Sequence, residues 1–354
     1  MPKLARKLKD DVAAIAIREG RVVGSPGHAK ARRYLLGRMQ ELGVEPFRGN
    51  SFELPYTWGG DEFVNLAGAI PGASPSAKPV LIGAHYDSVI PAPCADDNAA
   101  AVAIALAAAE MLAKQKLPRD VVIAIFDAEE PWHFQEPSMG SIRFYHDQLR
   151  ERGAHAALIM DLVGHDVLVP AEMLRSFPWL RWPAKLLPRI GDDLAVPGVR
   201  DLLFMTGAES HPGLADVVDS VRVPRRLRPI ATLNRYVGDM SDHGVFRTNG
   251  VPCLFFSCGR WRHYHAESDT PDKLNYAKMA RIARYLAAVA KALAATDLEP
   301  HDGASVDTAE FEIRRIRKAC GPAFGLVMKW LRIEKLETRA DISALAGKLL
   351  GMGL

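Results

Sequence analysis

The sequence contains histidine and acidic residues at positions where they could bind divalent metal ions. Each lies just past a short apolar run or at the start of a helical pattern, and together they are His85, Asp97, Glu129, Glu130, Asp161 and His265. Nitrogen and oxygen ligands without sulfur suit hard-to-borderline cations such as Zn²⁺, with Co²⁺ or Mn²⁺ as substitutes. The set therefore predicts a metal centre.

Taken singly, each of these positions also has an ordinary explanation. The Asp-Asn pair at 97–98 could cap a helix, the acidic pair at 129–130 could be a solvated helix start, and an isolated histidine is often satisfied in the core or at the surface. Asp161 is harder to explain, because a carboxylate at the end of a buried strand must find a partner or water. The combination, and not any one member, predicts the metal centre.

The set is large enough to hold two cations. Two metal ions about 3.5 to 4 Å apart need a bridging carboxylate, and Asp97, in the middle of the set, is the natural candidate. The remaining ligands divide into His85 and Asp161 for one ion and Glu130 and His265 for the other. Glu129, beside a ligand, is left free to take a proton from a bound water.

Four apolar runs of strand length carry these residues: PVLIGAH, VVIAIFDA, AALIMDLVG and VPCLFFSCG. Continuously apolar strands that alternate with helices predict an α/β fold with a mostly parallel central sheet covered by helices on both faces. In such a sheet the carboxyl ends of the strands meet at one edge, where ligands bind.

Other elements can be predicted around these strands. Helical patterns cover the opening segment, His28–Leu42 with Gly43 as its stop, and Asn98–Leu117 with Pro118 as its stop. The runs SFELPY and FVNLAGAIPG predict two short strands. We expect Asp166–Arg235, rich in proline, arginine and tryptophan, to form loops and short helices over one rim.

The composition shifts after Thr296, where DLEPHDGASVD predicts a linker. We therefore divide the chain into a catalytic α/β domain, residues 1–297, and a helical C-terminal extension, residues 298–354. Apolar residues at helical spacing over 324–331 and 342–349 predict helices in the extension. We expect these helices to pack on the main domain or on the partner subunit of a homo-oligomer.

Composition excludes several classes of protein. The 354 residues are 48% hydrophobic and 25% charged, as in an ordinary globular protein. The net charge of +3, with short basic clusters, speaks against nucleic acid as a partner. No apolar run reaches the ~18 residues that span a membrane, and acidic residues interrupt the start where a secretory signal would continue. We therefore expect a cytoplasmic protein without membrane contact.

The cysteines point to no chemistry of their own. They are scattered without a Cys-x-x-Cys pair and are Cys94, Cys253, Cys258 and Cys320. This pattern predicts neither a thiolate zinc site nor a disulfide framework, and we expect reduced, buried thiols.

Six motifs in series give the chain a family resemblance. They are GAHYDSV, ADDNAAAVA, IFDAEE followed by MGS, IMDLVG, SDHGVF with GVP, and YHAESDTPDKLN, in a match from about Arg21 to Leu293. Together they resemble the co-catalytic two-zinc aminopeptidases, the family of bacterial secreted leucine aminopeptidase (metallopeptidase family twenty-eight, clan MH). The resemblance implies a zinc peptidase domain of the phosphorylase/hydrolase-like α/β type over 1–297. It also implies hydrolysis of the amino-terminal bond of a peptide with a free amino terminus.

The resemblance implies roles for individual residues as well. It gives the five ligands and Glu129 the roles assigned above. Asp87 would orient His85 through a hydrogen bond, and Tyr264 would hydrogen-bond the developing oxyanion. The Asp97–Asn98 peptide bond would be cis.

The chain departs from the family pattern in three places. They are Ala100-Ala101 where the family has Ser-Gly, Ala266 where it has Thr, and the loop Pro131–Met139, which is longer than the usual link. The loop would place Trp132, His133 and Phe134 near the substrate, or would simply pack over the rim. The preference for the side chain of the first substrate residue can therefore not be inferred from the family. We assign no ligand role to His133, His243 or His263.

Two other functions fit parts of the sequence. Glutaminyl cyclases, which use one zinc ion to cyclise amino-terminal glutamine, resemble the chain in having a longer loop after the paired acidic residues. In a cyclase His85 would not bind a metal, and ADDNAA and YHAESDTPDKL resemble the peptidases more closely. The other possibility is a non-enzymatic binding protein of this fold, but such relatives lose ligands, whereas every expected ligand is present here.

Overall fold

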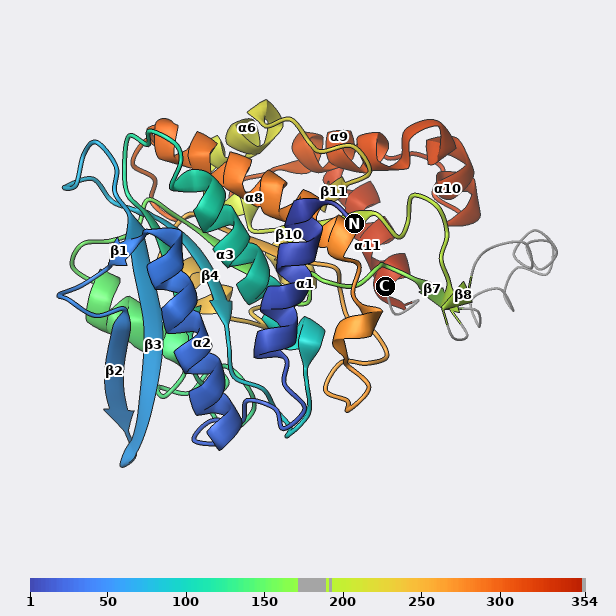
Figure 1. Ribbon diagram of the computed structural model, residues 1–354. Helices are drawn as coiled ribbons and strands as arrows, with labels where there is room; N and C mark the ends of the chain where they lie inside the picture. The colour runs from blue at the N-terminus through green and yellow to red at the C-terminus, as the bar shows by residue number, and fades with distance from the viewer. Residues whose placement is uncertain (171–188, 191–192, 352–354) are drawn as a thin grey trace.

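A nine-stranded sheet runs through the protein, with helices against both of its faces (Figure 1). The computed structural model describes residues 1–170, 189–190 and 193–351. The sheet contains β1 (Glu45–Pro46), β2 (Glu53–Trp58), β3 (Asp61–Ile70), β4 (Val80–His85), β5 (Val121–Phe126), β6 (Ala156–Met160), β10 (Leu202–Thr206), β11 (Arg228–Ala231) and β12 (Cys253–Ser257). Their order is β1-β3-β5-β4-β6-β12-β10-β11, and β2 pairs with β3. A small separate sheet contains β7 (Val169–Pro170), β8 (Arg189–Ile190) and β9 (Asp193–Leu194).

The centre of the large sheet is parallel. β5, β4, β6 and β12 are neighbours that run in the same direction, and every residue of β4, β5 and β6 is buried. Strands with continuous apolar residues suit a position that is covered on both faces. β3 joins β5 and β10 joins β12 in antiparallel pairs. The predicted α/β class with a mostly parallel central sheet is confirmed, with antiparallel pairs toward the edges.

Helices cover both faces of the sheet. One face carries α1 (Lys3–Ile15), α2 (Pro26–Leu42), α3 (Ala100–Leu112) and α8 (Tyr276–Ala295), and the other carries α4 (Gly140–Phe144) and α7 (His243–Thr248). Ile82 of β4 belongs to the core under α3 and α8, whereas its neighbour Leu81 belongs to the core with Phe246 of α7. Adjacent strand residues thus reach opposite faces, as the pleat of a strand requires.

The predicted early helices are confirmed, and one of them ends sooner than expected. Ser25 accepts the backbone N–H of His28 at the start of α2, and Gly43 ends the helix in the left-handed conformation with φ 69°. The alanine-rich α3 ends at Leu112, although the helical pattern extended to Leu117. The chain turns after Leu112 and brings Leu117 back to the core, where it is buried.

The prediction for Asp166–Arg235 was wrong in part. Within its described residues lie β10, β11 and α6 (Pro212–Ser220), and both strands belong to the central sheet. These strands are short and each has two residues that are only partly buried, so they lack the continuous apolar pattern of β4 or β6. Residues 171–188 and 191–192 of this prediction lie outside the described part of the chain.

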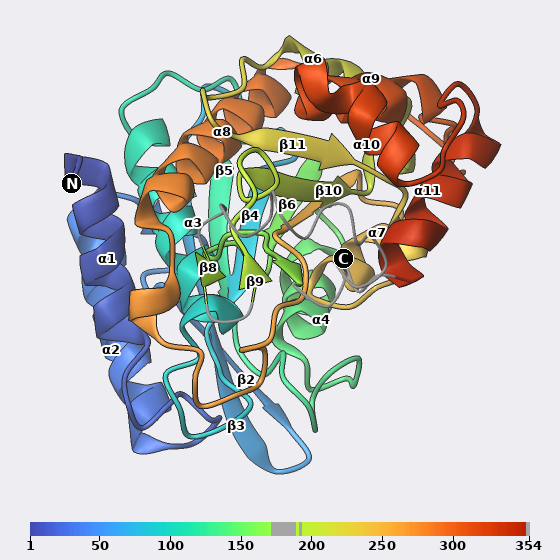
Figure 2. The ribbon, with the colours of Figure 1, turned by 90° about the vertical axis from the view of Figure 1, so that its right-hand side faces the viewer.

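The C-terminal segment is helical, as expected. It contains α9 (Ala309–Cys320), α10 (Phe324–Trp330) and α11 (Arg339–Gly351), which share an apolar cluster of their own. Figure 2 shows α9 beside β11, and Ile230 of β11 packs against that cluster. The boundary at residue 297 and assembly through these helices stay predictions.

Within the described residues, no helix is long and apolar enough to cross a membrane. All four cysteines are free thiols. Three of them are buried as expected, but Cys320, at the end of α9, is partly exposed.

Candidate metal centre

The carboxyl ends of the parallel strands bring the predicted ligands together. His85 is the last residue of β4, Asp161 follows β6 directly, and the acidic pair Glu129-Glu130 lies just past β5. Asp97 lies in the irregular turn that precedes α3, and His265 lies in the loop after β12. Residues far apart in the sequence thus reach one edge because β5, β4, β6 and β12 run in the same direction.

Asp97 lies between two histidines. Its Oδ1 atom is 3.4 Å from Nε2 of His85, and its Oδ2 atom is 3.2 Å from Nε2 of His265. The two carboxylate oxygens therefore face different imidazoles. This is the arrangement expected of a carboxylate shared by two cations.

The other acidic residues complete two groups of ligand atoms. Oε2 of Glu130 is 3.1 Å from Nε2 of His265, and Oδ1 of Asp161 is 3.8 Å from Nε2 of His85. Oε2 of Glu129 is also within 3.7 Å of that His85 nitrogen. One atom each of His85, Asp97 and Glu130 lie within 4.8 Å of one another, and so do atoms of His85, Glu129 and Asp161. The structure thus brings each of the six predicted residues close to at least one other member of the set.

Several of these atoms are buried without a hydrogen-bond partner among the described residues. They are His85 Nε2, Asp97 Oδ2, Glu130 Oε1 and Asp161 Oδ1. A buried polar atom without a partner costs free energy, so such atoms are rare in proteins. All four belong to one cluster of nitrogen and oxygen donors, which a divalent cation would satisfy. The residues present therefore fit a metal centre.

The charge balance of the cluster calls for added positive charge. Burial and the neighbouring carboxylates raise the pKa of Glu129, and raise that of Glu130 to about 8. Burial also raises the pKa of Asp161. Burial alone would lower the pKa of His85 and His265, but the surrounding carboxylates outweigh it and raise both, to about 9 for His265. A cluster that draws in protons in this way is one in which cations can replace them.

Asp87 holds His85 and the backbone of the acidic pair in place through hydrogen bonds. Nδ1 of His85 is 3.2 Å from Oδ1 of Asp87, which leaves Nε2 of His85 directed at Asp97. The same carboxylate accepts the backbone N–H groups of Glu129 and Glu130, each at 3.1 Å. A hydrogen bond of this kind fixes the tautomer and orientation of a ligand histidine.

The backbone around the ligands has unusual conformations. The Asp97–Asn98 peptide bond is cis, as the resemblance implies. Ala128, Leu162 and His265 have φ values of 53°, 52° and 55°, in the left-handed region that side chains disfavour. Such conformations cluster at functional sites, where the surrounding structure holds them. Three of them beside one cluster support its functional character.

Tyr264 lies against the cluster. Its ring stacks on the ring of His265 at a centroid distance of 3.7 Å. Burial, and then the carboxylates of Asp97 and Asp161, raise the pKa of the hydroxyl group, so it stays protonated and can donate.

The sequence matches the family described as Peptidase family M28 over residues 65–170 and 190–290, which is more than half of the chain. The chain belongs to this family. The matched residues include Asp87 and all six residues of the cluster.

Relatives of this M28 protein support the fold. The uncharacterized protein YfbL of Escherichia coli (strain K12) is 30% identical over 219 residues, which are 57% of this chain and 63% of YfbL. The chain thus spans less than two thirds of that relative. LapA aminopeptidase of Legionella pneumophila has a TM-score of 0.61 at 17% identity, over 83% of this chain and 73% of LapA. A glutaminyl cyclase of Porphyromonas gingivalis has a TM-score of 0.58 at 16% identity, over 82% of this chain and 99% of the cyclase.

Sequence reasoning missed Asp242 in this M28 site. It is fully buried, and neither carboxylate oxygen has a hydrogen-bond partner among the described residues. Burial raises its pKa to about 7, and its charge in turn contributes to the raised pKa of Glu129. Asp242 is part of the motif SDHGVF. It does not follow a predicted strand, so the sequence pattern did not indicate that it lies near the other acidic residues.

The three histidines without an assigned ligand role have other partners. Nδ1 of His133 is 3.0 Å from Ser138 Oγ, and Nδ1 of His263 is 2.8 Å from Ser268 Oγ. Nε2 of His243 is 3.0 Å from Oδ1 of Asn234. None of the three is in the two groups of potential ligand atoms found in the described part of the chain.

The long loop Pro131–Met139 is partly packed and partly exposed. The Tyr56 hydroxyl group donates to the Ser138 carbonyl at 3.0 Å, and His133 packs edge-on against Phe63. Trp132, two residues after Glu130, is 94% exposed. The loop is therefore anchored on β2 and β3, but it presents one large apolar side chain to solvent close in sequence to the candidate ligand Glu130.

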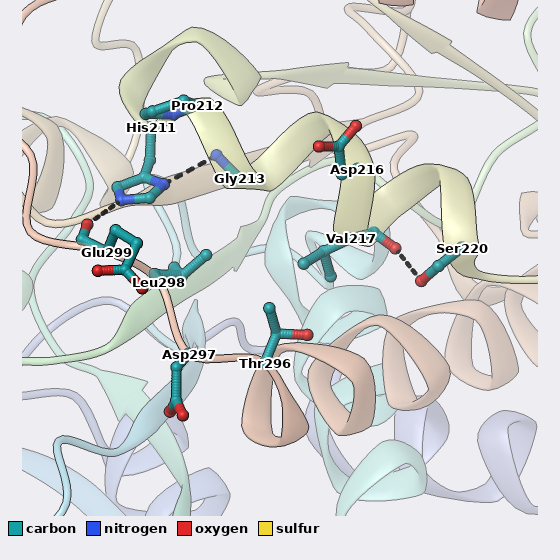
Figure 3. A pocket seen from close by; sticks show the side chains of 10 residues that line it. All are labelled: His211, Pro212, Gly213, Asp216, Val217, Ser220, Thr296, Asp297, Leu298 and Glu299. Atoms are coloured by element: carbon teal, nitrogen blue, oxygen red, sulfur yellow. Dashed lines mark hydrogen bonds between the residues drawn. The ribbon is translucent and has the colours of Figure 1, made fainter.

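A hollow of about 370 Å³ between α6 and residues 296–299 is a separate feature (Figure 3). His211 lines it, but both of its ring nitrogens are engaged. Nδ1 accepts the backbone N–H of Gly213, and Nε2 donates to the Glu299 carbonyl. The histidine has no nitrogen left for a metal or a substrate, so this hollow is not a second candidate site.

Proposed function

We propose that this M28 protein is a zinc-dependent aminopeptidase, which removes amino-terminal residues from peptides with the help of two zinc ions. The observation that carries the proposal is the position of Asp97, whose two oxygens face His85 and His265. A site for a single ion does not need a carboxylate shared between two imidazoles.

The distances support the proposed ligands. His85 and Asp161 would hold one ion, Glu130 and His265 would hold the other, and Asp97 would bind both. Zinc suits this set because it binds imidazole nitrogen and carboxylate oxygen well, and Co²⁺ or Mn²⁺ could replace it. The ions would polarise the scissile carbonyl and make water acidic enough to attack at neutral pH.

Glu129 is the proposed general base. Its carboxylate lies 3.7 Å from Nε2 of His85, and burial raises its pKa, which favours uptake of a proton. It would accept a proton from the attacking water and return that proton to the leaving amine. The Tyr264 hydroxyl group would donate a hydrogen bond to the oxygen that becomes negative in the transition state.

The proposed substrate is a peptide with a free amino terminus. A protonated α-amine is attracted by carboxylates, and the edge of the sheet has an excess of them. Asp161 and Glu129 are candidates for this contact, because their side chains are 12% and 7% exposed and thus reach the surface of the cluster. Capture of the amine would confine cleavage to the first peptide bond.

The alternative is a single-zinc glutaminyl-peptide cyclotransferase, since the fold is shared with a glutaminyl cyclase. In that function Asp97, Glu130 and His265 would hold the one ion and His85 would bind none. The unpartnered Nε2 atom of His85, directed into the cluster, favours the aminopeptidase.

Metal content of the purified protein and of His85→Ala tests the proposal. Elemental mass spectrometry on protein purified without chelator should give two zinc ions per chain, falling toward one in the variant. The rate of hydrolysis of aminoacyl amides and dipeptides should be high for protein with two zinc ions per chain and low for protein with one. One ion per chain, unchanged in His85→Ala, together with cyclisation of amino-terminal glutamine, would favour the cyclotransferase instead.

A further inference from the structure

The backbone of Asp97 is held from two sides by buried charged residues that the proposed chemistry does not use. These residues are Arg21 and Asp269, and both are 0% exposed. We propose that Arg21 and Asp269 are positioning residues that clamp the backbone of Asp97 and thereby set where its carboxylate points. The inference rests on the metal-binding part of the proposed function.

Asp269 holds the N–H side of the clamp. Its Oδ2 atom accepts the backbone N–H of Asp97 at 3.1 Å, and its two oxygens accept the backbone N–H of Asp96 at 3.0 and 3.1 Å. Its own backbone carbonyl accepts the N–H of Ala95 at 3.1 Å. Asp269 thus accepts hydrogen bonds from three consecutive backbone N–H groups before the cis peptide bond, those of Ala95, Asp96 and Asp97.

Arg21 holds the carbonyl side of the clamp. Its Nη2 atom donates to the carbonyl of Asp97 at 3.2 Å and to the carbonyl of Cys94 at 3.0 Å. Nη1 donates to the Pro93 carbonyl at 2.6 Å, and Nε donates to the Tyr86 carbonyl at 2.7 Å. The guanidinium group therefore ties the residue after His85 to the residues around Asp97.

The clamp also joins segments that carry different ligands. Asp269 lies four residues after His265, and the intervening turn is closed by the Asp269 N–H donating to the Ala266 carbonyl at 3.0 Å. Arg21 contacts the loop that begins after His85. Both histidines are thereby connected to the Asp97 backbone through one charged side chain each.

Side chains with several hydrogen-bonding atoms suit this task. The Asp269 carboxyl group has two oxygens that can accept and the Arg21 guanidinium group has five N–H groups that can donate, so each residue engages several backbone groups at once. A carboxylate that must face two imidazoles tolerates little rotation of its own backbone, and the irregular turn at 95–99 has no helix or strand ladder to hold it. The two buried side chains supply the partners that regular structure would otherwise provide.

The test uses the full chain with Asp269→Asn, Asp269→Glu and the matched control Asp11→Asn. Asp11 is also a buried carboxylate, but it accepts from Tyr34 Oη and Arg38 Nε, between α1 and α2, and contacts no metal ligand. For each protein one measures the zinc dissociation constant by chelator competition, and the melting temperature after the metal has been stripped.

The clamp predicts a loss of zinc affinity that the control does not share. Asp269→Asn places an amide NH₂ against a backbone N–H, so its zinc dissociation constant should rise by about 10- to 100-fold, the range typical of residues that orient ligands. Asp269→Glu keeps the charge at a shifted position and should lie between Asp269→Asn and the wild type. Asp11→Asn should keep the wild-type zinc affinity. This should hold even if the melting temperature of metal-free Asp11→Asn is as low as that of metal-free Asp269→Asn.

Wild-type zinc affinity in Asp269→Asn, or an equal loss in Asp11→Asn, would overturn the clamp. So would failure of both Asp269 variants to fold when Asp11→Asn folds, because the residue would then serve folding and not the metal site. If the wild type itself binds no zinc, the proposed function fails along with the clamp. If the wild type binds zinc and the Asp269 variants bind it equally tightly, only the clamp fails.

Discussion

The carboxylate of Asp87 accepts the backbone N–H of Glu129 at a distance of 3.1 Å. Because the contact is made by the main chain, the Glu129 side chain contributes nothing to it. Removing that side chain leaves in place the hydrogen bonds that fix the acidic pair and His85. The chemistry of Glu129 can therefore be tested without moving the ligands around it.

Glu129→Ala should retain its metal ions and lose most of its turnover. A general base contributes about 10²- to 10⁴-fold to a rate, so kcat should fall by about that factor with metal content unchanged. Glu136→Ala, on the exposed part of the same loop, is the control and should keep full activity. Loss of metal together with activity in Glu129→Ala would make Glu129 a ligand and contradict its role as a base.

Trp132→Ala should raise KM and leave kcat and stability nearly unchanged. The side chain is 94% exposed two residues after Glu130, so the folded protein gains little from it and a bound peptide can cover it. Covering about 55 Å² of apolar surface at about 25 cal/mol per Å² corresponds to about a tenfold change in binding. Steady-state kinetics with peptides of several lengths measures the effect. Trp58→Ala, at the far end of β2, is the control, and equal KM values for all three proteins would remove Trp132 from the substrate site.

His243 should make the free energy of unfolding depend on pH. Burial lowers its pKa to about 4 from the ordinary 6.5, so between these pH values the unfolded chain binds a proton that the folded chain does not. Stability should therefore be fully present above pH 6.5 and fall as the pH drops toward 4, by at most about 1.4 kcal/mol per pH unit.

His243→Gln isolates this contribution, because glutamine can still donate to Asn234 but does not titrate. Urea unfolding of both proteins at pH 7, 5.5 and 4.5 measures it. The wild type should lose stability relative to His243→Gln as the pH falls. Parallel curves for the two proteins would show that His243 is protonated as easily in the folded state as in the unfolded state.

Gly140→Ala should destabilise the protein by about 2 kcal/mol or more. A Cβ atom at Gly140 would lie 2.1 Å from the carbonyl oxygen of Asp127, at the end of β5. The backbone there cannot move without shifting Glu129 and Glu130. Gly37→Ala is the matched control, since a Cβ atom there meets nothing within 4 Å in the middle of α2. Gly37→Ala should stabilise the protein by about 0.5 to 1 kcal/mol. Thermal unfolding measures both effects, and the melting temperature should fall in Gly140→Ala and rise in Gly37→Ala.

The central strands could be predicted from the sequence because their apolar residues are continuous. β4, β5 and β6 bury every residue, and β12 buries all but its last residue, Ser257, as expected of strands that are covered on both faces. β11 could not be predicted in the same way. It has four residues, it contains Pro229 and only alternate positions are fully buried, so its pattern does not differ from that of a loop.

The candidate ligands could be selected from the sequence because they follow those strands or precede α3, whereas the residues that hold their backbone could not. Arg21 and Asp269 act through backbone groups of residues distant in sequence, and no residue type or spacing records such contacts. Asp242 comes directly before α7 and follows no strand, so the pattern of strand ends does not indicate it.

The helix α9 has a consequence for how molecules of this protein behave toward each other. β11 is the last strand of the sheet within the described residues, and a free edge strand offers unpaired N–H and C=O groups to strands of other molecules. α9 packs along β11, and Arg228 of that strand donates to the Ala319 carbonyl at the end of the helix (Figure 2). The C-terminal helices thus cover part of this edge, and we expect them to hinder strand pairing between molecules.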